Sequence, residues 1–356
     1  MTSQITRRLP AEWEPQDGVM LTWPHAGTAW APQLAAVERV YRDLAEAITQ
    51  RETAFIVCRD EAHREVVAAQ LAHLDRTRIR YALAPSNDTW ARDHGPIAIC
   101  DGGKPRLLDF VFNGWGGKHA HDLDNAINRH LAESAGFASS MTQTDFVLEG
   151  GAIDTDGAGT LLTTRHCLLT PTRNPELNET AIEDRLRREL GVTRVLWLDH
   201  GELAGDDTDG HIDTLARFCD PATIAYASCD DPADEHYAEL LAMRGELEAL
   251  RQRDGNPYRL IPLPLPHACY DDEQRLPATY ANFLIINDVV LVPTYGDPTA
   301  DKHALRALAD AFPGREVIGI DCLPLIRQYG SLHCVTMQLP AGALATPPAD
   351  MPPPCT

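Results

Sequence analysis

Hydrophobic and polar side chains recur along the chain with two different periods. Near the N-terminus, apolar residues at helical spacing alternate with charged ones, namely Val37, Val40, Tyr41, Leu44 and Ile48. This spacing predicts an amphipathic helix whose apolar stripe faces a core. The same pattern predicts further helices over 61–74, 122–135, 177–190, 233–253 and 301–312.

Short runs of β-branched and aromatic residues lie between these helices and predict strands. They span 53–58, 96–100, 106–112, 159–163, 194–198, 222–227, 258–263, 283–286, 289–293 and 316–320. Asn287-Asp288, between two of these runs, predicts a hairpin turn. Strands outnumber helices by nearly two to one, whereas a simple βαβ alternation would give about one of each. The pattern therefore favours a mixed α/β fold of small strand-strand-helix-strand units over a doubly wound sheet.

The sequence contains few signs of domain boundaries. Ile261–Pro277 is rich in proline and is predicted to be a long functional loop. The segment 341–356 carries two proline clusters and is predicted to be a disordered tail, which leaves 1–340 as a single domain. The most apolar window, 283–293, is too short to span a bilayer, and residues 1–10 lack the apolar region of a signal peptide.

Composition narrows the classes of partner. The chain has 52 acidic and 31 basic residues and a net charge of −21, which opposes binding to nucleic acid or to an anionic membrane. Solubility is the simplest reason for this charge, and attraction of a small cationic ligand is the second. The nine cysteines are scattered without C-x-x-C or zinc spacing, which predicts a reduced, cytoplasmic protein without a structural metal. Nucleotide-binding glycine motifs are missing from the sequence.

The peptide Gly330–Gln338 places a cysteine, Cys334, on a short β-prone run after a Gly-Ser turn and a histidine. A thiol held at the start of a strand could face a cleft as a nucleophile. It could equally be an inert core thiol, because free cysteine is among the most buried residue types. This peptide alone leaves both interpretations open.

Three further polar clusters interrupt the apolar pattern. Asn87–Pro96 brings Asp88, Trp90 and Asp93 just before a strand, where sites of α/β folds often lie, although a solvated turn would look the same. Glu149 precedes Gly150-Gly151, which is most often just a turn or bulge. The third cluster, 112–118, holds Trp115 in a glycine-rich loop; it offers a platform for a cation or simple core packing.

A fourth cluster, 205–214, contains His211 and Asp213. It lacks the glutamate spacing of a calcium loop. In a strand these two side chains would point to the same face, where a base and an acid could act together in proton transfer. A solvated run of surface charge is the alternative.

Together the clusters supply a thiol, an imidazole, several carboxylates and two tryptophans. Metal binding is disfavoured, because the histidines lack ligand spacing and the carboxylates come from distant segments. A guanidinium fits better: it pairs bidentately with carboxylates, and its carbon is an electrophile that a thiolate can attack. Carboxylates beside the thiol should also raise the pKa of Cys334 until a cation is bound.

The clusters resemble, in number and order, the motifs of the agmatine deiminases, within the superfamily of guanidino-group-modifying enzymes. The matching segments are Leu9–Pro15, Trp90–Pro96, Glu149–Gly151, Asp207–Asp213, Tyr280–Phe283 and Gly330–Gln338. The resemblance implies a five-bladed, pseudo-symmetric α/β propeller (pentein) of ββαβ units around a central site. It also implies a homodimer and a reaction without metal or organic cofactor.

The resemblance implies five catalytic residues. Cys334 matches the nucleophile and His211 the general acid/base, while Asp93 and Asp213 match the carboxylates that grip the guanidinium. Glu149 matches an acid that pairs with the histidine.

For the remainder of the substrate, Asp207 matches a binding acid, and Trp90 and Trp115 match the aromatic walls of the site. Asp88, from the same cluster as Asp93, is counted with them.

The implied reaction converts agmatine to N-carbamoylputrescine and ammonia through a thiouronium on Cys334. It belongs to putrescine biosynthesis or to agmatine and arginine catabolism. Departures from the family pattern at Tyr329–Ser331, Asp209 and Thr214 leave the chemistry intact but make the substrate less certain. The alternative is an arginine or peptidylarginine deiminase that forms citrulline. A charged carboxylate on the substrate would need a cation, and the motifs offer only Arg92 and Lys118, which favours agmatine.

Overall fold

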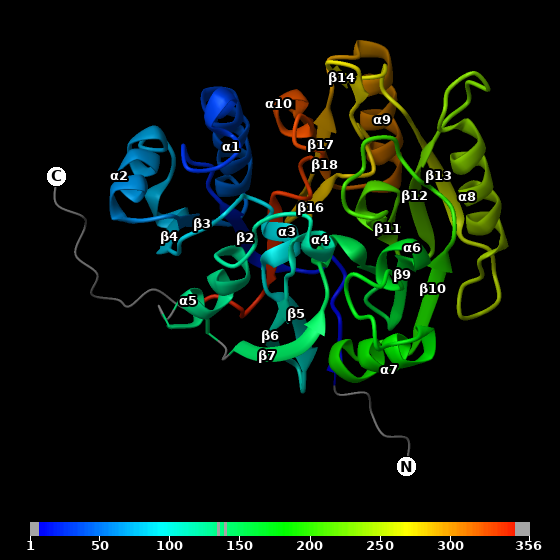
Figure 1. Ribbon diagram of the computed structural model, residues 1–356, viewed down its shortest axis with the longest axis horizontal. Coiled ribbons are helices and arrows are strands. Elements are labelled where there is room, and N and C mark those ends of the chain that lie inside the picture. Colours follow the sequence, from blue (N-terminus) through cyan, green and yellow to red (C-terminus); the bar gives the residue numbers. More distant parts are fainter. Residues whose placement is uncertain (1–6, 134–135, 139–140, 346–356) are drawn as a thin grey trace.

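The computed structural model describes residues 7–133, 136–138 and 141–345. The longer helices lie at the periphery in Figure 1, and the short helices α3 and α4 lie near the middle. The helices are α1 (Leu34–Thr49), α2 (Glu61–Gln70), α3 (Ala91–His94), α4 (Gly114–Gly117), α5 (Ile127–Glu133), α6 (Arg165–Leu168), α7 (Glu179–Leu190), α8 (Tyr237–Ala249), α9 (Pro298–Ala311) and α10 (Leu323–Ile326). No helix in this described part of the chain is long and apolar enough to cross a membrane.

The strands form six sheets within the described residues. Their bounds are β1 (Arg7–Arg8), β2 (Gln16–Thr22), β3 (Thr53–Cys58), β4 (Ile79–Leu83), β5 (Ile97–Asp101), β6 (Lys104–Val111), β7 (Met141–Val147), β8 (Asp154–Thr155), β9 (Thr160–Thr164), β10 (Arg194–Leu198), β11 (Ala216–Asp220), β12 (Thr223–Ser228), β13 (Arg259–Pro264), β14 (Tyr270–Asp271), β15 (Gln274–Arg275), β16 (Leu284–Ile286), β17 (Val289–Thr294), β18 (Glu316–Asp321) and β19 (Thr336–Pro340). The sheet orders are β1-β5-β6-β7, β10-β9-β8, β11-β12-β13, β14-β15, β16-β17-β18 and β19-β2-β3-β4.

Five of these sheets repeat one pattern. In β16-β17-β18, for example, the first two strands pair antiparallel and the third joins parallel, with α9 in the connection. The same order holds for β5-β6-β7, β8-β9-β10 and β11-β12-β13. The last sheet joins both ends of the chain, because β19 pairs with β2 before α1 leads to β3. The predicted mixed α/β fold and the excess of strands over helices are therefore confirmed.

Local sequence explains why the elements begin and end where they do. Asn178 caps α7 by accepting a hydrogen bond from the backbone of Ala181, and Gly191 ends the helix with φ 73°. The hairpin predicted at Asn287-Asp288 is present between β16 and β17, with Asp288 in the left-handed region. Both strands of this hairpin are buried throughout except near Thr294, so they form part of the core.

The structure corrects several predicted boundaries. The long loop predicted over 261–277 is wrong in part, because its start completes β13 and its middle forms the ribbon β14-β15. The helix predicted from 122 begins as a 3-10 turn, and α5 starts only at Ile127. Ala343 and Leu344 of the predicted tail are buried, whereas 346–356 lie outside the described residues. The strand β7 escaped prediction because four of its seven side chains are polar and only Phe146 is buried.

Candidate active site

Cys334 lies in a turn, two residues before β19, rather than on the strand itself as predicted. Only 4% of the residue is exposed. The Asn282 side chain donates a hydrogen bond from Nδ2 to the sulfur at 3.2 Å, and Asp213 Oδ2 lies 3.7 Å from the sulfur. The thiol is therefore buried against two polar groups, which a purely structural core cysteine would not require.

Asp93 lies on α3 and is also buried. Its Oδ2 accepts a hydrogen bond from the Trp115 indole at 2.9 Å, and its Oδ1 accepts one from the Gly151 backbone at 3.1 Å. Trp115 adopts a left-handed backbone conformation with φ 54°, which is rare for a bulky residue. The glycine-rich loop thus holds a strained tryptophan that orients Asp93.

The expectation that His211 and Asp213 share one face of a strand is wrong. His211 precedes a 3-10 turn, Ile212–Thr214. The side chains of His211 and Asp213 both lie next to Gly151. A Cβ atom at Gly151 would lie 2.5 Å from His211 Nδ1 and 3.2 Å from Asp213 Oδ2. Only glycine leaves room for both side chains here, which explains the Gly-Gly pair after Glu149.

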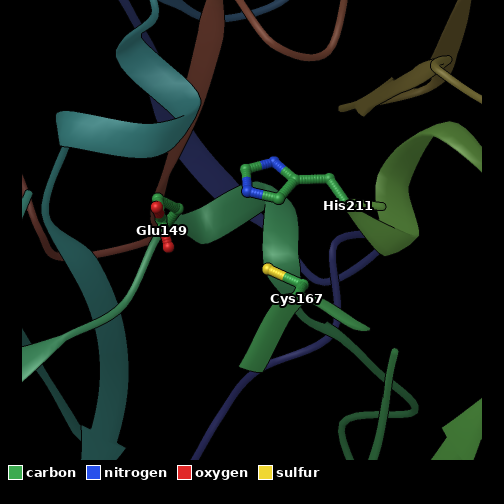
Figure 2. A group of neighbouring side chains, drawn as sticks. All are labelled: Glu149, Cys167 and His211. Atoms are coloured by element: carbon green, nitrogen blue, oxygen red, sulfur yellow. The ribbon is translucent and has the colours of Figure 1, made fainter. Parts of the chain in front are cut away.

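Glu149 and Cys167 lie beside His211 (Figure 2), and polar atoms of the three residues lie within 4.8 Å of one another. Such a trio could hold a metal ion. However, Arg173 Nε contacts both Glu149 oxygens, at 2.9 and 3.0 Å, so a cation already neutralises that carboxylate. The direct pairing of Glu149 with His211 that the resemblance implied is not observed. Neither ring nitrogen of His211 has a hydrogen-bond partner among the described residues.

A cavity of about 260 Å³ leads to the thiol. Its lining includes six of the nine residues expected in the site, namely Asp88, Trp90, Asp93, Trp115, Asp207 and Cys334. The Trp90 ring lies against Gly330, where a Cβ atom would come within 2.1 Å of it. The remaining three expected residues, Glu149, His211 and Asp213, are fully buried around the inner end of this cavity.

The outer part of the cavity carries more exposed polar groups. Asp207 accepts a hydrogen bond from His119 at 2.6 Å, and its carboxylate lies 3.5 Å from Lys118 Nζ. Asp88 accepts one from the Trp30 indole at 2.9 Å. Arg327 also lines the cavity. The cavity is therefore acidic along its length, with one arginine among its lining residues.

Electrostatics at the inner end oppose ionisation of the thiol. Burial, followed by the Asp213 and Asp93 carboxylates, raises the pKa of Cys334 well above its ordinary value, in the direction expected from the sequence. Burial also raises the pKa of Asp93 to about 6. Burial opposes the charge on His211, yet Asp93 and its other neighbours raise the pKa of its ring to about 10. The buried site therefore disfavours the thiolate of Cys334 and favours the protonated ring of His211.

The sequence motifs do not single out some of the residues that lie around the thiol. Asn282 and Glu12 lie in matched motifs, but nothing in a linear motif shows that they meet Cys334 or its neighbour His333. Arg173 lies outside every motif, although it is buried between Glu149 and Asp209. Only the fold brings these side chains together.

Comparisons with known protein sequences show which family this chain resembles. The sequence pattern of the Porphyromonas-type peptidyl-arginine deiminase family matches residues 8–340. Agmatine deiminase of Stutzerimonas stutzeri is 35% identical over 94% of this chain and 95% of its own.

Solved structures of similar proteins match this chain over nearly its whole length. A Porphyromonas gingivalis protein assigned provisionally as an arginine deiminase is 53% identical, with a TM-score of 0.89 over 95% of this chain and all of its own. A cysteine-to-serine variant of C. jejuni agmatine deiminase with substrate bound is 38% identical, with a TM-score of 0.87 over 94% and 96% of the two chains. The chain belongs to the agmatine deiminase family, within the pattern of the Porphyromonas-type peptidyl-arginine deiminases.

Proposed function

We propose that this protein is an agmatine deiminase that hydrolyses the guanidinium of agmatine to N-carbamoylputrescine and ammonia. One observation carries the proposal: Asp213 Oδ1, a buried carboxylate oxygen of a residue that contacts the thiol, has no hydrogen-bond partner among the described residues. Leaving such an atom unpaired is costly unless a ligand completes it, and a guanidinium offers N–H donors in a plane that matches carboxylates.

The chemistry begins when the Cys334 thiol loses its proton to solvent water. A bound guanidinium beside Asp93 and Asp213 offsets their negative charge, so the thiolate of Cys334 becomes accessible when substrate arrives. The sulfur then forms a bond to the guanidinium carbon. The His211 imidazolium donates its proton to the departing nitrogen, the C–N bond breaks, and ammonia leaves.

A water molecule completes the turnover. It attacks the carbon of the thiouronium while neutral His211 accepts its proton. The C–S bond then breaks, which releases the ureido product and returns the thiolate. Asp93 is the main group that favours the protonated form of the ring, and Glu149, which Arg173 also contacts, adds a smaller effect. These roles for Cys334 and His211 need no group beyond the chain and water.

Charge in the cavity supports agmatine over arginine. Asp88, Asp93 and Asp207 line it, and agmatine carries a positive amine at its far end. Arginine would place a carboxylate there instead. Arg92 cannot bind it, because its guanidinium is buried and lies 3.3 Å from Glu12. Lys118 contacts Asp207 and Asp209, and Arg327 is the cation that favours the second candidate, an arginine or peptidylarginine deiminase.

The finer architecture belongs to the same proposal. We take the five repeated ββαβ sheets as the blades of one propeller, formed by residues 1–340, with β19 and β2 joining its ends. A reduced, cytoplasmic homodimer that acts in putrescine formation or agmatine catabolism stays a prediction from the family resemblance.

One assay tests the activity. The purified protein is incubated separately with agmatine, arginine and an arginyl peptide, and both ammonia and the ureido product are measured. We expect release from agmatine at the highest kcat/KM. An Arg327→Ala variant serves as the discriminating control: it should lose arginine activity if arginine is the substrate and keep agmatine activity. Ammonia from arginine but not from agmatine would contradict the proposal.

A further inference from the structure

His333 precedes the nucleophile and bridges two carboxylates deep in the protein. Its Nδ1 lies 2.7 Å from Asp213 Oδ2, and its Nε2 lies 2.7 Å from Glu12 Oε1. The ring is 1% exposed. Its backbone N–H donates to Asn282 Oδ1 at 2.8 Å, which fixes the base of the side chain. His333 therefore connects Asp213, the carboxylate proposed to bind substrate, to a second acid, Glu12.

The two contacts determine how many protons the bridge holds. A neutral imidazole carries one N–H and presents a lone pair at its other nitrogen. A lone pair 2.7 Å from an ionised carboxylate oxygen would be repulsive. Both contacts become hydrogen bonds only if one further proton is present, either on the ring or on a carboxyl group of Asp213 or Glu12.

The neighbouring charges place that proton on the ring. Burial disfavours ionised Glu12, but Arg217, His333 and Arg92 outweigh it and lower the pKa of this acid far below its ordinary value. The pKa of Asp213 is also lowered, against burial, by His333 and His211. Neither carboxyl therefore holds a proton at neutral pH.

Opposing influences act on the ring itself. Burial, followed by Arg217 and Arg92, lowers the pKa of His333 below its ordinary value, although Glu12 and Asp213 act to raise it. The two short contacts favour the charged form, because only an imidazolium donates to both acids. Charge balance also favours a charged ring. The anions of this cluster are Glu12, Asp154 and Asp213. With His333 charged, three cations face them, namely Arg92, Arg217 and His333.

We propose that His333 is a positioning residue that bridges Glu12 and Asp213 as an imidazolium and so aims Asp213 Oδ1 at the substrate guanidinium. Because Oδ2 of Asp213 is engaged by the ring, Oδ1 is left without a partner among the described residues. The same positive charge lies next to Cys334 and offsets the carboxylates that suppress its thiolate. The functional half of this inference rests on the proposed deiminase activity.

The protonation state is tested directly by NMR of the full-length protein labelled with ¹⁵N-histidine. His333→Asn identifies the His333 signals, and His94 is the matched control. His94 is similarly buried, its Nε2 lies 3.3 Å from the Thr22 hydroxyl, and burial lowers its pKa to about 3. We expect both His333 nitrogens to show imidazolium shifts at pH 8 while His94 is neutral. A neutral His333 ring at pH 8 would overturn the inference.

The second readout is the ionisation of Cys334, followed as the pH dependence of its alkylation by iodoacetamide with peptide mass spectrometry. His333→Asn keeps a donor for Asp213 but loses the charge, and His333→Phe loses both. We expect the thiol pKa to rise in both variants, with KM for agmatine rising most in His333→Phe. His94→Asn should change neither quantity.

An unchanged thiol pKa in His333→Asn would also overturn the inference. Neither the NMR spectrum nor the alkylation requires turnover. An inactive wild-type protein with a charged His333 would therefore count against the deiminase activity and not against the charged bridge. If His333→Phe fails to fold, the wild-type spectrum and His333→Asn still decide the matter.

Discussion

The two ends of the cavity contain the same kinds of residue and differ in their access to water. At the inner end, here called the floor, Cys334, Asp93, His211 and Asp213 are each at most 5% exposed. At the outer end, here called the mouth, the Asp207 side chain is 35% exposed and that of His119 is 49% exposed. The acids of the mouth are paired, whereas the floor keeps unpaired atoms.

We therefore associate the floor with the chemical reaction and the mouth with the recognition of a cationic substrate. Charges on the floor interact at low dielectric, where each contact that a ligand completes is worth more than it is in water. Charges at the mouth are screened by water and salt, so each contributes little affinity and mainly guides the approach of a cation. We therefore expect substitutions on the floor to abolish turnover and substitutions at the mouth to tune it.

The largest effect is expected from Cys334→Ser. A hydroxyl in place of the sulfur that we propose as nucleophile should lower kcat for agmatine by roughly 10⁴- to 10⁶-fold, while the fold is kept. Cys219→Ser, which alters another buried cysteine, is the control and should stay near the wild-type rate. Steady-state ammonia release measures both. A Cys334→Ser variant with full activity would remove the nucleophile from the mechanism.

Asp213→Asn should come next. Losing one partner of a buried charge pair costs about 2–5 kcal/mol, which corresponds to a loss of roughly 30- to 5000-fold in kcat/KM. The same change should make the free thiol more acidic, because Asp213 raises the pKa of Cys334. Kinetics and alkylation against pH measure the two opposite shifts. Activity within threefold of wild type would show that Asp213 does not hold the guanidinium.

The pH dependence should also reflect the floor. Because the pKa of Asp93 is raised to about 6, this acid loses its charge as the pH falls below that value, and kcat/KM should drop about tenfold per unit. The His211 ring loses its proton only near pH 10, where the upper limb should begin. A flat profile between pH 4 and 6 would mean that no floor carboxylate titrates. Asp207→Asn should leave the lower limb in place.

The smallest effect is expected at the mouth, from Asp207→Asn. A half-exposed, salt-bridged acid contributes about 0.2–1 kcal/mol, so kcat/KM should fall only about 1.5- to 5-fold. The loss should shrink further when the salt concentration rises, because screening weakens the contact in the wild-type protein. Measuring kcat/KM at low and high salt checks this. A loss as large as that of Asp213→Asn would erase the distinction between floor and mouth.

Sequence patterns predicted the longer helices and many of the strands, because strong apolar periodicity marks them, but they missed the buried strands β2 and β11. They also failed where polarity hides the element, as in β7, and where tertiary contacts set the local conformation. His211 and Asp213 illustrate the second case: a 3-10 turn, which alternation cannot reveal, places them around Gly151.

The motifs contained the residues that gather at the cavity, but they did not indicate which atoms meet. Arg173 took the Glu149 contact expected for His211, and no local pattern could have shown it, because the two residues lie 24 positions apart. His333 was visible only as a neighbour of Cys334, yet its partner Glu12 lies at the other end of the chain. Long-range pairing of buried charges is the part of this site that spacing alone does not encode.

The central claim is that Cys334 attacks the guanidinium carbon of agmatine. A single turnover with excess enzyme, quenched in acid at successive times and analysed by peptide mass spectrometry, tests it directly. We expect the peptide that contains Cys334 to gain transiently the mass of agmatine less ammonia, at the rate at which ammonia appears. Ammonia release with that peptide unmodified at every time, or with the adduct on another cysteine, would contradict the account.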